Sequence, residues 1–150
     1  MKKTINEMIV KLKADSVNER FARAMVASFC VQAEPSLDEI TDIKTAVSEA
    51  VTNSVVHAYP KSSGWIEIEA KLYDDKIEIV VSDNGVGIKD ISKALEPFYT
   101  TKPLEERSGM GFTVMESFMD EMDVSENMGG GLKVRLVKIF EKKSKLAVGE

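Results

Sequence analysis

The amino-acid sequence predicts an α+β fold, a two-layer α/β sandwich whose mixed, mostly antiparallel sheet carries its helices on one face. Two hairpin patterns favour this sheet, one formed by residues 65–73 and 76–82, the other by residues 123–127 and 132–140. Helical patterns lie before and between the hairpins, so the helices are expected to gather on one face. A chain of 150 residues, 43% of them hydrophobic, suits a single domain with a sizeable core.

The first half of the chain predicts one strand and two helices. Alternating apolar residues over 4–13 indicate the strand. Residues 16–19 have the spacing of a capping box and open a helix that runs to about Ala33. A second box at residues 36–39 opens a longer helix, which is expected to end near Pro60 because the residue before a proline disfavours helical geometry.

The second half contains a long irregular stretch between the hairpins. Residues 83–109 include three glycines and two prolines, with one short helix expected around 91–95. A loop of this length inside a compact domain is usually functional. Helical spacing returns over 111–122. We therefore expect one domain over residues 1–140, followed by a disordered tail at 141–150.

Composition narrows the classes of function. The net charge is −5 and the pI about 5.1, with the 20 Lys and Arg residues spread along the chain, so direct nucleic-acid binding is not expected. No apolar run is long enough to span a membrane, and no membrane partner is expected. The single cysteine, Cys30, excludes an internal disulfide. We expect a cytoplasmic protein.

Three polar residues lie along one side of the second helix. Glu49, Asn53 and His57 are each four residues apart, while Ile43 and Val47 belong to an apolar face that favours burial. A carboxylate, an amide and an imidazole aligned on a partly buried helix indicate a ligand site.

Two glycine loops follow. Asp83 ends a strand and precedes Gly85 and Gly87, which allows close approach of the backbone to a ligand, although the same residues also suit an ordinary turn. The stretch 108–111, Ser-Gly-Met-Gly, directly precedes a helix and could present backbone N–H groups to phosphate, or serve as a linker with a serine cap. No Walker P-loop is present in the sequence.

These three motifs, E-x-x-x-N, D-x-G-x-G and G-x-G, stand in an order that resembles the GHKL ATP-binding superfamily, which includes gyrase and the histidine kinases, over residues 36–140. The stretches EAVTNSVVHAY and EPFYTTKPLEERSGMGFTVMESFMDEMDV more closely resemble the anti-sigma F family of spore-forming bacteria. That resemblance implies a Bergerat-type ATP-binding fold. It also implies a serine protein kinase that holds a sporulation sigma factor inactive.

The resemblance assigns roles to the motif residues, with ATP or ADP and Mg²⁺ as ligands. Asn53 would be the Mg²⁺ ligand and Glu49 the general base. Asp83 would accept the exocyclic amine of adenine and thus favour ATP over GTP. Gly85 and Gly87 would leave space near the nucleotide.

A lid over about residues 88–108 would cover the nucleotide, and Arg107 in it would stabilise the transferring phosphoryl group. The other nucleotide contacts expected in the lid and at the start of the following helix are hydroxyls, one positive charge and backbone amides, from Thr100, Thr101, Lys102, Ser108, Gly109, Met110 and Gly111. Leu132 stands where the family usually has a threonine that helps to hold adenine.

The partners implied are a sporulation sigma factor, an anti-anti-sigma protein phosphorylated on serine, and a second copy of the chain in a homodimer. The N-terminal strand and helix could pair the subunits, and Arg23 is either a partner contact or a solvated arginine. His57 is compatible with a phosphate-end role or a structural one. Three alternatives remain: a stress-response anti-sigma kinase, a nucleotide-gated sigma-binding module without kinase activity, and a detached ATPase or histidine-kinase domain. The absence of a separate phosphoacceptor histidine and the short lid argue against the last.

Overall fold

The structure of the chain is a computed structural model that describes residues 3–59, 64–88, 91–96 and 111–141. The first half comprises β1 (Asn6–Lys13), α1 (Val17–Cys30) with a 3₁₀ turn (Val31–Ala33), α2 (Leu37–Asn53) and its π-helical continuation η2 (Ser54–Ala58). The second half comprises β2 (Trp65–Leu72), β3 (Lys76–Asp83), α3 (Ile91–Ala94), α4 (Gly111–Phe118), β4 (Glu121–Glu126) and β5 (Leu132–Ile139).

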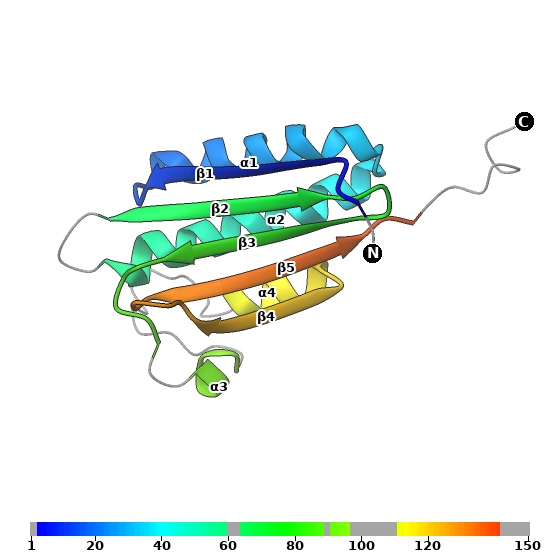
Figure 1. Cartoon of the computed structure of the whole chain (residues 1–150). Helices are drawn as coiled ribbons and strands as arrows, with labels where there is room; N and C mark the ends of the chain where they lie inside the picture. The colour runs from blue at the N-terminus through cyan, green and yellow to red at the C-terminus, as the bar shows by residue number, and fades with distance from the viewer. Residues whose placement is uncertain (1–2, 60–63, 89–90, 97–110, 142–150) are drawn as a thin grey trace, which may run out of the picture.

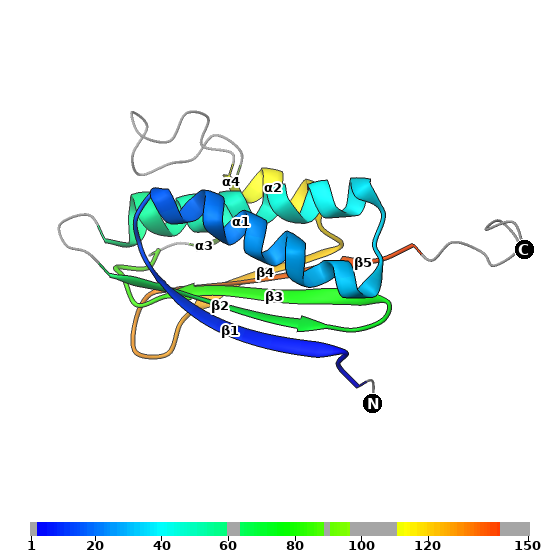
Figure 2. The same ribbon diagram turned by 90° about the horizontal axis from the view of Figure 1, so that it is seen from above.

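The expected two layers are present: helices α1, α2 and α4 cover one face of the sheet, and the other face is left open (Figures 1 and 2). The strand order is β1-β2-β3-β5-β4, and all four described pairings are antiparallel. The mixed character predicted for the sheet is therefore wrong. Strands β3 and β4 do run in the same direction, but β5 returns between them and pairs with both, so no parallel ladder forms.

The core lies between the sheet and the helices. Alternate residues of the central strands point inward and are fully buried, including Ile66, Ile68, Ile77 and Ile79. Helix α2 supplies the apolar face predicted from its spacing, with Ile43 at its centre. Within the part of the chain that the structure describes, no helix combines the length and apolar character needed to cross a membrane.

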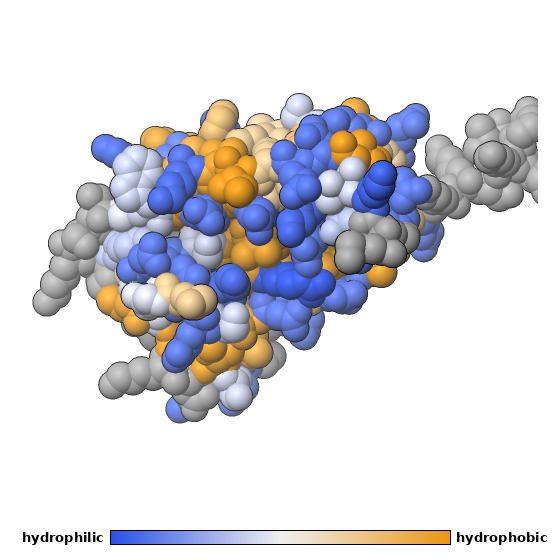
Figure 3. Space-filling view, in the orientation of Figure 1, coloured by the Kyte–Doolittle hydropathy of each residue, from blue (hydrophilic) through white to orange (hydrophobic). Residues whose placement is uncertain are grey.

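The open face of the sheet is largely charged, with apolar side chains scattered between the charges (Figure 3). Arg135 on β5 forms ion pairs with Glu78, Glu121 and Asp123 on the two neighbouring strands. Such cross-strand pairs suit a solvated surface. This face therefore needs no covering layer for the fold to be stable.

The two predicted capping boxes have different outcomes. In the second, the Ser36 hydroxyl accepts from the Glu39 N–H at 3.1 Å while Glu39 accepts from the Ser36 N–H at 2.7 Å, as predicted. The first box is wrong. Ser16 makes no side-chain cap, and Glu19 instead contacts Ser48 and Arg23.

One further prediction needs correction. The helix expected over 111–122 ends at Phe118, and Met122 lies in β4, opposite Leu136 of β5. Met122, which faces inward from this strand, lies four residues after Phe118 and so continued the helical spacing by coincidence. The last described residue, Glu141, donates its N–H to the buried carboxylate of Glu39 at 2.7 Å. Residues 142–150 of the expected tail lie outside the described residues.

Candidate nucleotide site and acceptor groove

Helix α2 and its π-helical continuation place the predicted polar stripe against two hollows. Glu49 lines a groove of about 420 Å³ between α1 and α2. Asn53 and His57, one and two turns further on, line a small pocket of about 20 Å³ beside the end of β3. Glu49 and Asn53 are one turn apart on the same side of α2. The groove and the pocket nevertheless have no lining residue in common.

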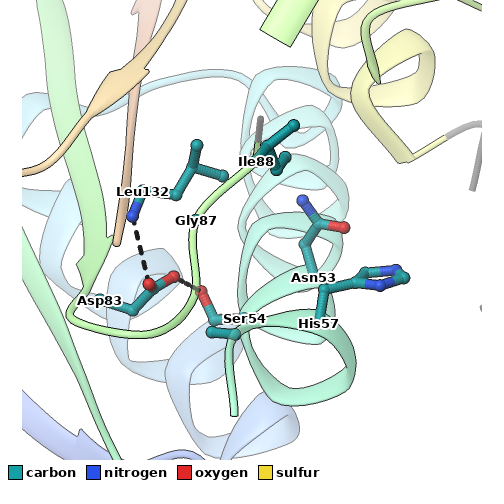
Figure 4. A pocket seen from close by; sticks show the side chains of 8 residues that line it. Asn53, Ser54, His57, Asp83, Gly87, Ile88 and Leu132 are labelled. Atoms are coloured by element: carbon teal, nitrogen blue, oxygen red, sulfur yellow. Dashed lines mark hydrogen bonds between the residues drawn. The ribbon is translucent and has the colours of Figure 1, made fainter. Parts of the chain in front are cut away.

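Asp83 is the last residue of β3 and lines the pocket, where it is only 4% exposed. Its Oδ1 accepts from the backbone N–H of Gly85 at 3.0 Å and of Leu132 at 3.2 Å. Its Oδ2 accepts from the Ser54 hydroxyl at 3.0 Å (Figure 4). These three donors offset the cost of burying a carboxylate.

Glycine is required where β5 begins. Gly131 has a φ of +98°, and a Cβ there would lie 2.0 Å from the carbonyl oxygen of Asp83. This close approach of β5 to the end of β3 is what allows the Leu132 N–H to reach the Asp83 carboxylate.

The two predicted glycines of the Asp83 loop have different structural roles. A Cβ on Gly85 would lie 2.2 Å from the carbonyl oxygen of Ala58, so the loop packs directly on the end of η2. The Val86 N–H donates to that same carbonyl at 2.9 Å. Gly87, with a φ of +71°, lines the pocket itself. Packing against the helix end, and not only space for a ligand, therefore accounts for Gly85.

Two residues that the sequence reasoning missed hold the loop from outside. The Asn127 amide donates to the carbonyl oxygen of Asp83 at 2.8 Å. The Tyr59 hydroxyl donates to the Trp65 carbonyl at 2.7 Å and accepts from the Asn84 N–H at 2.9 Å. Tyr59 ends the stretch EAVTNSVVHAY and Asn127 ends a predicted strand, but nothing in the sequence indicated a role at the site for either of them. Ser54 and Gly131 were also missed, although Ser54 directly follows Asn53 and Gly131 directly precedes the predicted strand over 132–140.

The rest of the pocket is mainly apolar and suits a ligand that donates a hydrogen bond to Asp83. Ala58, Ile88 and Leu132 line it, and Leu132 has no hydroxyl to replace the family's threonine, although its N–H binds Asp83. A volume of about 20 Å³ holds a water molecule. The described residues by themselves therefore do not enclose a space of the size of a purine.

The groove carries charges from both helices. Arg23 lies 3.5 Å from the Glu19 carboxylate and donates to the Ser48 hydroxyl at 3.4 Å. Ser48 in turn donates to Glu19. Arg23, whose role the sequence left open, is therefore held at the groove by a residue adjacent in sequence to Glu49. The remaining lining residues are Thr41, Lys44, Thr45 and Thr52.

The described residues include no group of three or more His, Cys, Asp or Glu side chains that could hold a metal ion. The Asn53 amide oxygen is a suitable single ligand for Mg²⁺, which keeps several waters and commonly takes its other ligands from phosphates. The side chains thus fit a metal that arrives with a nucleotide better than one held by the protein alone.

Several predicted site residues lie outside the described residues, which exclude 89–90 and 97–110. They are Thr100, Thr101, Lys102, Arg107, Ser108, Gly109 and Met110. Of the final motif only Gly111 is described; it begins α4 and is buried. The roles given to all these residues remain predictions.

Comparison with known proteins gives consistent results. Residues 12–138 match the family of histidine kinase-like ATPase domains. The chain is 50% identical over 136 residues to the anti-sigma F factor of Clostridium beijerinckii, covering 90% of this chain and 95% of that protein. It is 53% identical over 133 residues to the anti-sigma F factor of Caldanaerobacter subterraneus, covering 89% and 93%.

Solved structures share the fold. The RsbU and RsbW domains of Rv1364c from Mycobacterium tuberculosis match with a TM-score of 0.68 at 22% identity, over 93% of this chain and 34% of that longer one. The catalytic domain of the histidine kinase ThkA matches with a TM-score of 0.57 at 15% identity, over 91% of this chain and 99% of that one. The predicted fold class, of the GHKL type, is confirmed.

Proposed function

Because the chain belongs to the histidine kinase-like ATPase domains and, within them, to the anti-sigma F factors, we propose that it inhibits a sporulation sigma factor and phosphorylates an anti-anti-sigma protein on serine. ATP is the phosphoryl donor. Inhibition of a sigma factor places the protein in the cytoplasm, where RNA polymerase acts. The observation that carries the enzymatic half is the position of Glu49 one helical turn before Asn53, which lines the pocket that also contains the buried Asp83 carboxylate.

The pocket supports binding of adenine. The buried carboxylate of Asp83 can accept the exocyclic amine of adenine, whereas guanine would place a carbonyl oxygen against it. Asn53 lines the same pocket and would contact the phosphate end of the nucleotide. Mg²⁺, bound by Asn53 and phosphate oxygens, would neutralise charge on the phosphates.

The groove supports binding of the acceptor serine. Its hydroxyl oxygen attacks the γ-phosphorus while the bond from that phosphorus to the β–γ bridging oxygen breaks, which yields phosphoserine and ADP. Glu49, half-buried in the groove, takes the hydroxyl proton. Arg23 at the other side of the groove offers a cation to the acidic surface of a partner. Arg107 retains its predicted role in stabilising the transferred group.

The N-terminal strand and helix support pairing of two subunits. β1 is an edge strand of the sheet, and exposed edges are available for pairing with another chain. The neighbouring apolar side chains are well exposed: Ile9 is 66% and Phe21 is 52% exposed. A homodimer that covers them would present two copies of Arg23 to a sigma factor.

The test is phosphoryl transfer from labelled ATP, with Mg²⁺, to a purified sporulation anti-anti-sigma protein. We expect Glu49→Gln to lower transfer by about 10²–10⁴-fold while leaving sigma-factor retention in a pull-down unchanged. Glu69→Gln, on the open face of the sheet, is the matched control and should transfer normally. If wild-type protein transfers nothing yet retains sigma factor in a nucleotide-dependent way, the chain is a nucleotide-gated binding module and the kinase proposal fails.

A further inference from the structure

The hydroxyl of Ser54 is directed at the carboxylate that lines the pocket. Ser54 is 6% exposed, and its hydroxyl donates to Asp83 Oδ2 across the gap between η2 and β3. On the same helix, Thr41 and Thr45 donate to the carbonyl four residues earlier, at 3.0 and 2.9 Å, whereas Ser48 donates to Glu19 of α1. Ser54 thus gives up the local bond common in helices for a bond to the site.

The π-helical turn accompanies this change. The Ser54 N–H bonds the carbonyls of both Ala50 and Val51, and the wider turn begins at this residue. Figure 4 shows Ser54 pointing toward Asp83, while the His57 ring points away from it. Single π-helical turns are rare and frequently occur at functional sites.

The distribution of donors on Asp83 is unequal. Oδ1 accepts two backbone N–H groups, which fill its lone pairs, whereas Oδ2 accepts only the Ser54 hydroxyl among the described contacts. Oδ2 therefore keeps one acceptor position for a ligand. Ser54 fixes the direction of that position, since the backbone donors alone leave Oδ2 without an anchor.

We propose that Ser54 is a positioning residue that aims the Asp83 carboxylate at the base and thereby sets the preference for adenine over guanine nucleotides. The inference rests on the proposed function, because it concerns the same nucleotide site. The Ser54 proton is committed to Asp83 and is not available to the carbonyl oxygen of guanine. Without the hydroxyl, the carboxylate can turn, and a water in the vacated space can donate to that oxygen instead.

The test measures dissociation constants of ATP and GTP by calorimetry for four full-length variants and the wild type. Ser54→Ala should lower the ratio of the GTP dissociation constant to the ATP dissociation constant about tenfold. Ser54→Thr, which keeps the hydroxyl, should have a ratio close to that of the wild type. Ser54→Cys keeps about the same side-chain volume but offers only a weak donor, so it should also narrow the ATP preference. It replaces Ser54→Ala in the test if the alanine variant does not fold. Ser82→Ala is the control, because Ser82 is equally buried, adjacent to Asp83, and directed to the opposite face of the sheet.

The outcomes separate this inference from the proposed function. Wild-type protein that binds neither nucleotide overturns the nucleotide site and the inference with it. Wild-type protein that binds ATP, with folded Ser54→Ala and Ser54→Cys variants of unchanged ATP-to-GTP preference, overturns only the role of Ser54. An equal loss of preference in Ser82→Ala also overturns it, because the effect would then be a general one of destabilising this strand.

Discussion

Replacement of Gly131 by alanine tests the close approach that builds the pocket. The substitution forces an L-residue into a φ of +98° and places a Cβ 2.0 Å from the carbonyl oxygen of Asp83. The same Cβ would lie 2.8 Å from the Cα of Asn84, so the obstructing atoms belong to the backbone and cannot rotate aside. The start of β5 must therefore move away from the end of β3.

The cost of this substitution has two parts. The positive φ costs about 1–2 kcal/mol for an alanine. The displacement also breaks the bond from the Leu132 N–H to the Asp83 carboxylate, which is worth about 1.5–3 kcal/mol because the acceptor is charged. Gly129→Ala is the matched control, since Gly129 has a φ of +84° but a Cβ there meets nothing within 4 Å. Gly131→Ala should therefore be about 1.5–3 kcal/mol less stable than Gly129→Ala.

Urea and thermal unfolding followed by circular dichroism measure the difference. For a chain of this length it corresponds to a gap in Tm of about 3–12 °C between the two variants. ATP affinity, measured on the folded fraction, should fall for Gly131→Ala and stay near the wild-type value for Gly129→Ala. Equal stabilities, or wild-type ATP affinity in Gly131→Ala, would refute the link between the β5 start and the Asp83 carboxylate.

Two further predictions concern titrating groups. Burial alone would raise the pKa of Glu39, but N–H donors from Ser36 and Glu141 and the charge of Lys138 outweigh it and hold the pKa below its ordinary 4.5. Wild-type protein should therefore have a higher unfolding free energy than Glu39→Gln above about pH 4.5, and this difference should disappear as the pH falls through the lowered pKa of Glu39. Urea titrations from pH 7 to 3 measure the difference, and a difference that does not change with pH would contradict the prediction. Burial raises the pKa of the Cys30 thiol to about 11, so native protein at pH 8 should react with a disulfide reagent at least about 10²-fold more slowly than urea-unfolded protein, and equal rates would show that Cys30 is accessible.

Local features were predictable where the interactions that form them involve only residues close together in the sequence. The Ser36–Glu39 box closes within one helical turn, and the hairpin of β2 and β3 forms around Asp74-Asp75 as its alternation predicts. The box at Ser16 has the same spacing and failed, because Glu19 finds a partner on α2 that no local pattern reveals. Trp65 is a large apolar residue, but it is 53% exposed because the alternation of β2 directs it to the open face.

For the site, the sequence by itself determined which chemistry is present: a carboxylate at a strand end, an amide and a second carboxylate one turn apart on a helix, and glycines where the backbone must bend. The tertiary structure decided how that chemistry is held. Ser54, Asn127 and Leu132 bind the Asp83 carboxylate or its backbone carbonyl although they lie 29 to 49 residues away in the chain. Such contacts depend on how β5 pairs beside β3 and how the π-helical turn faces the sheet. Contacts between residues far apart in the chain produce no periodic pattern in the sequence, so the sequence could not predict them.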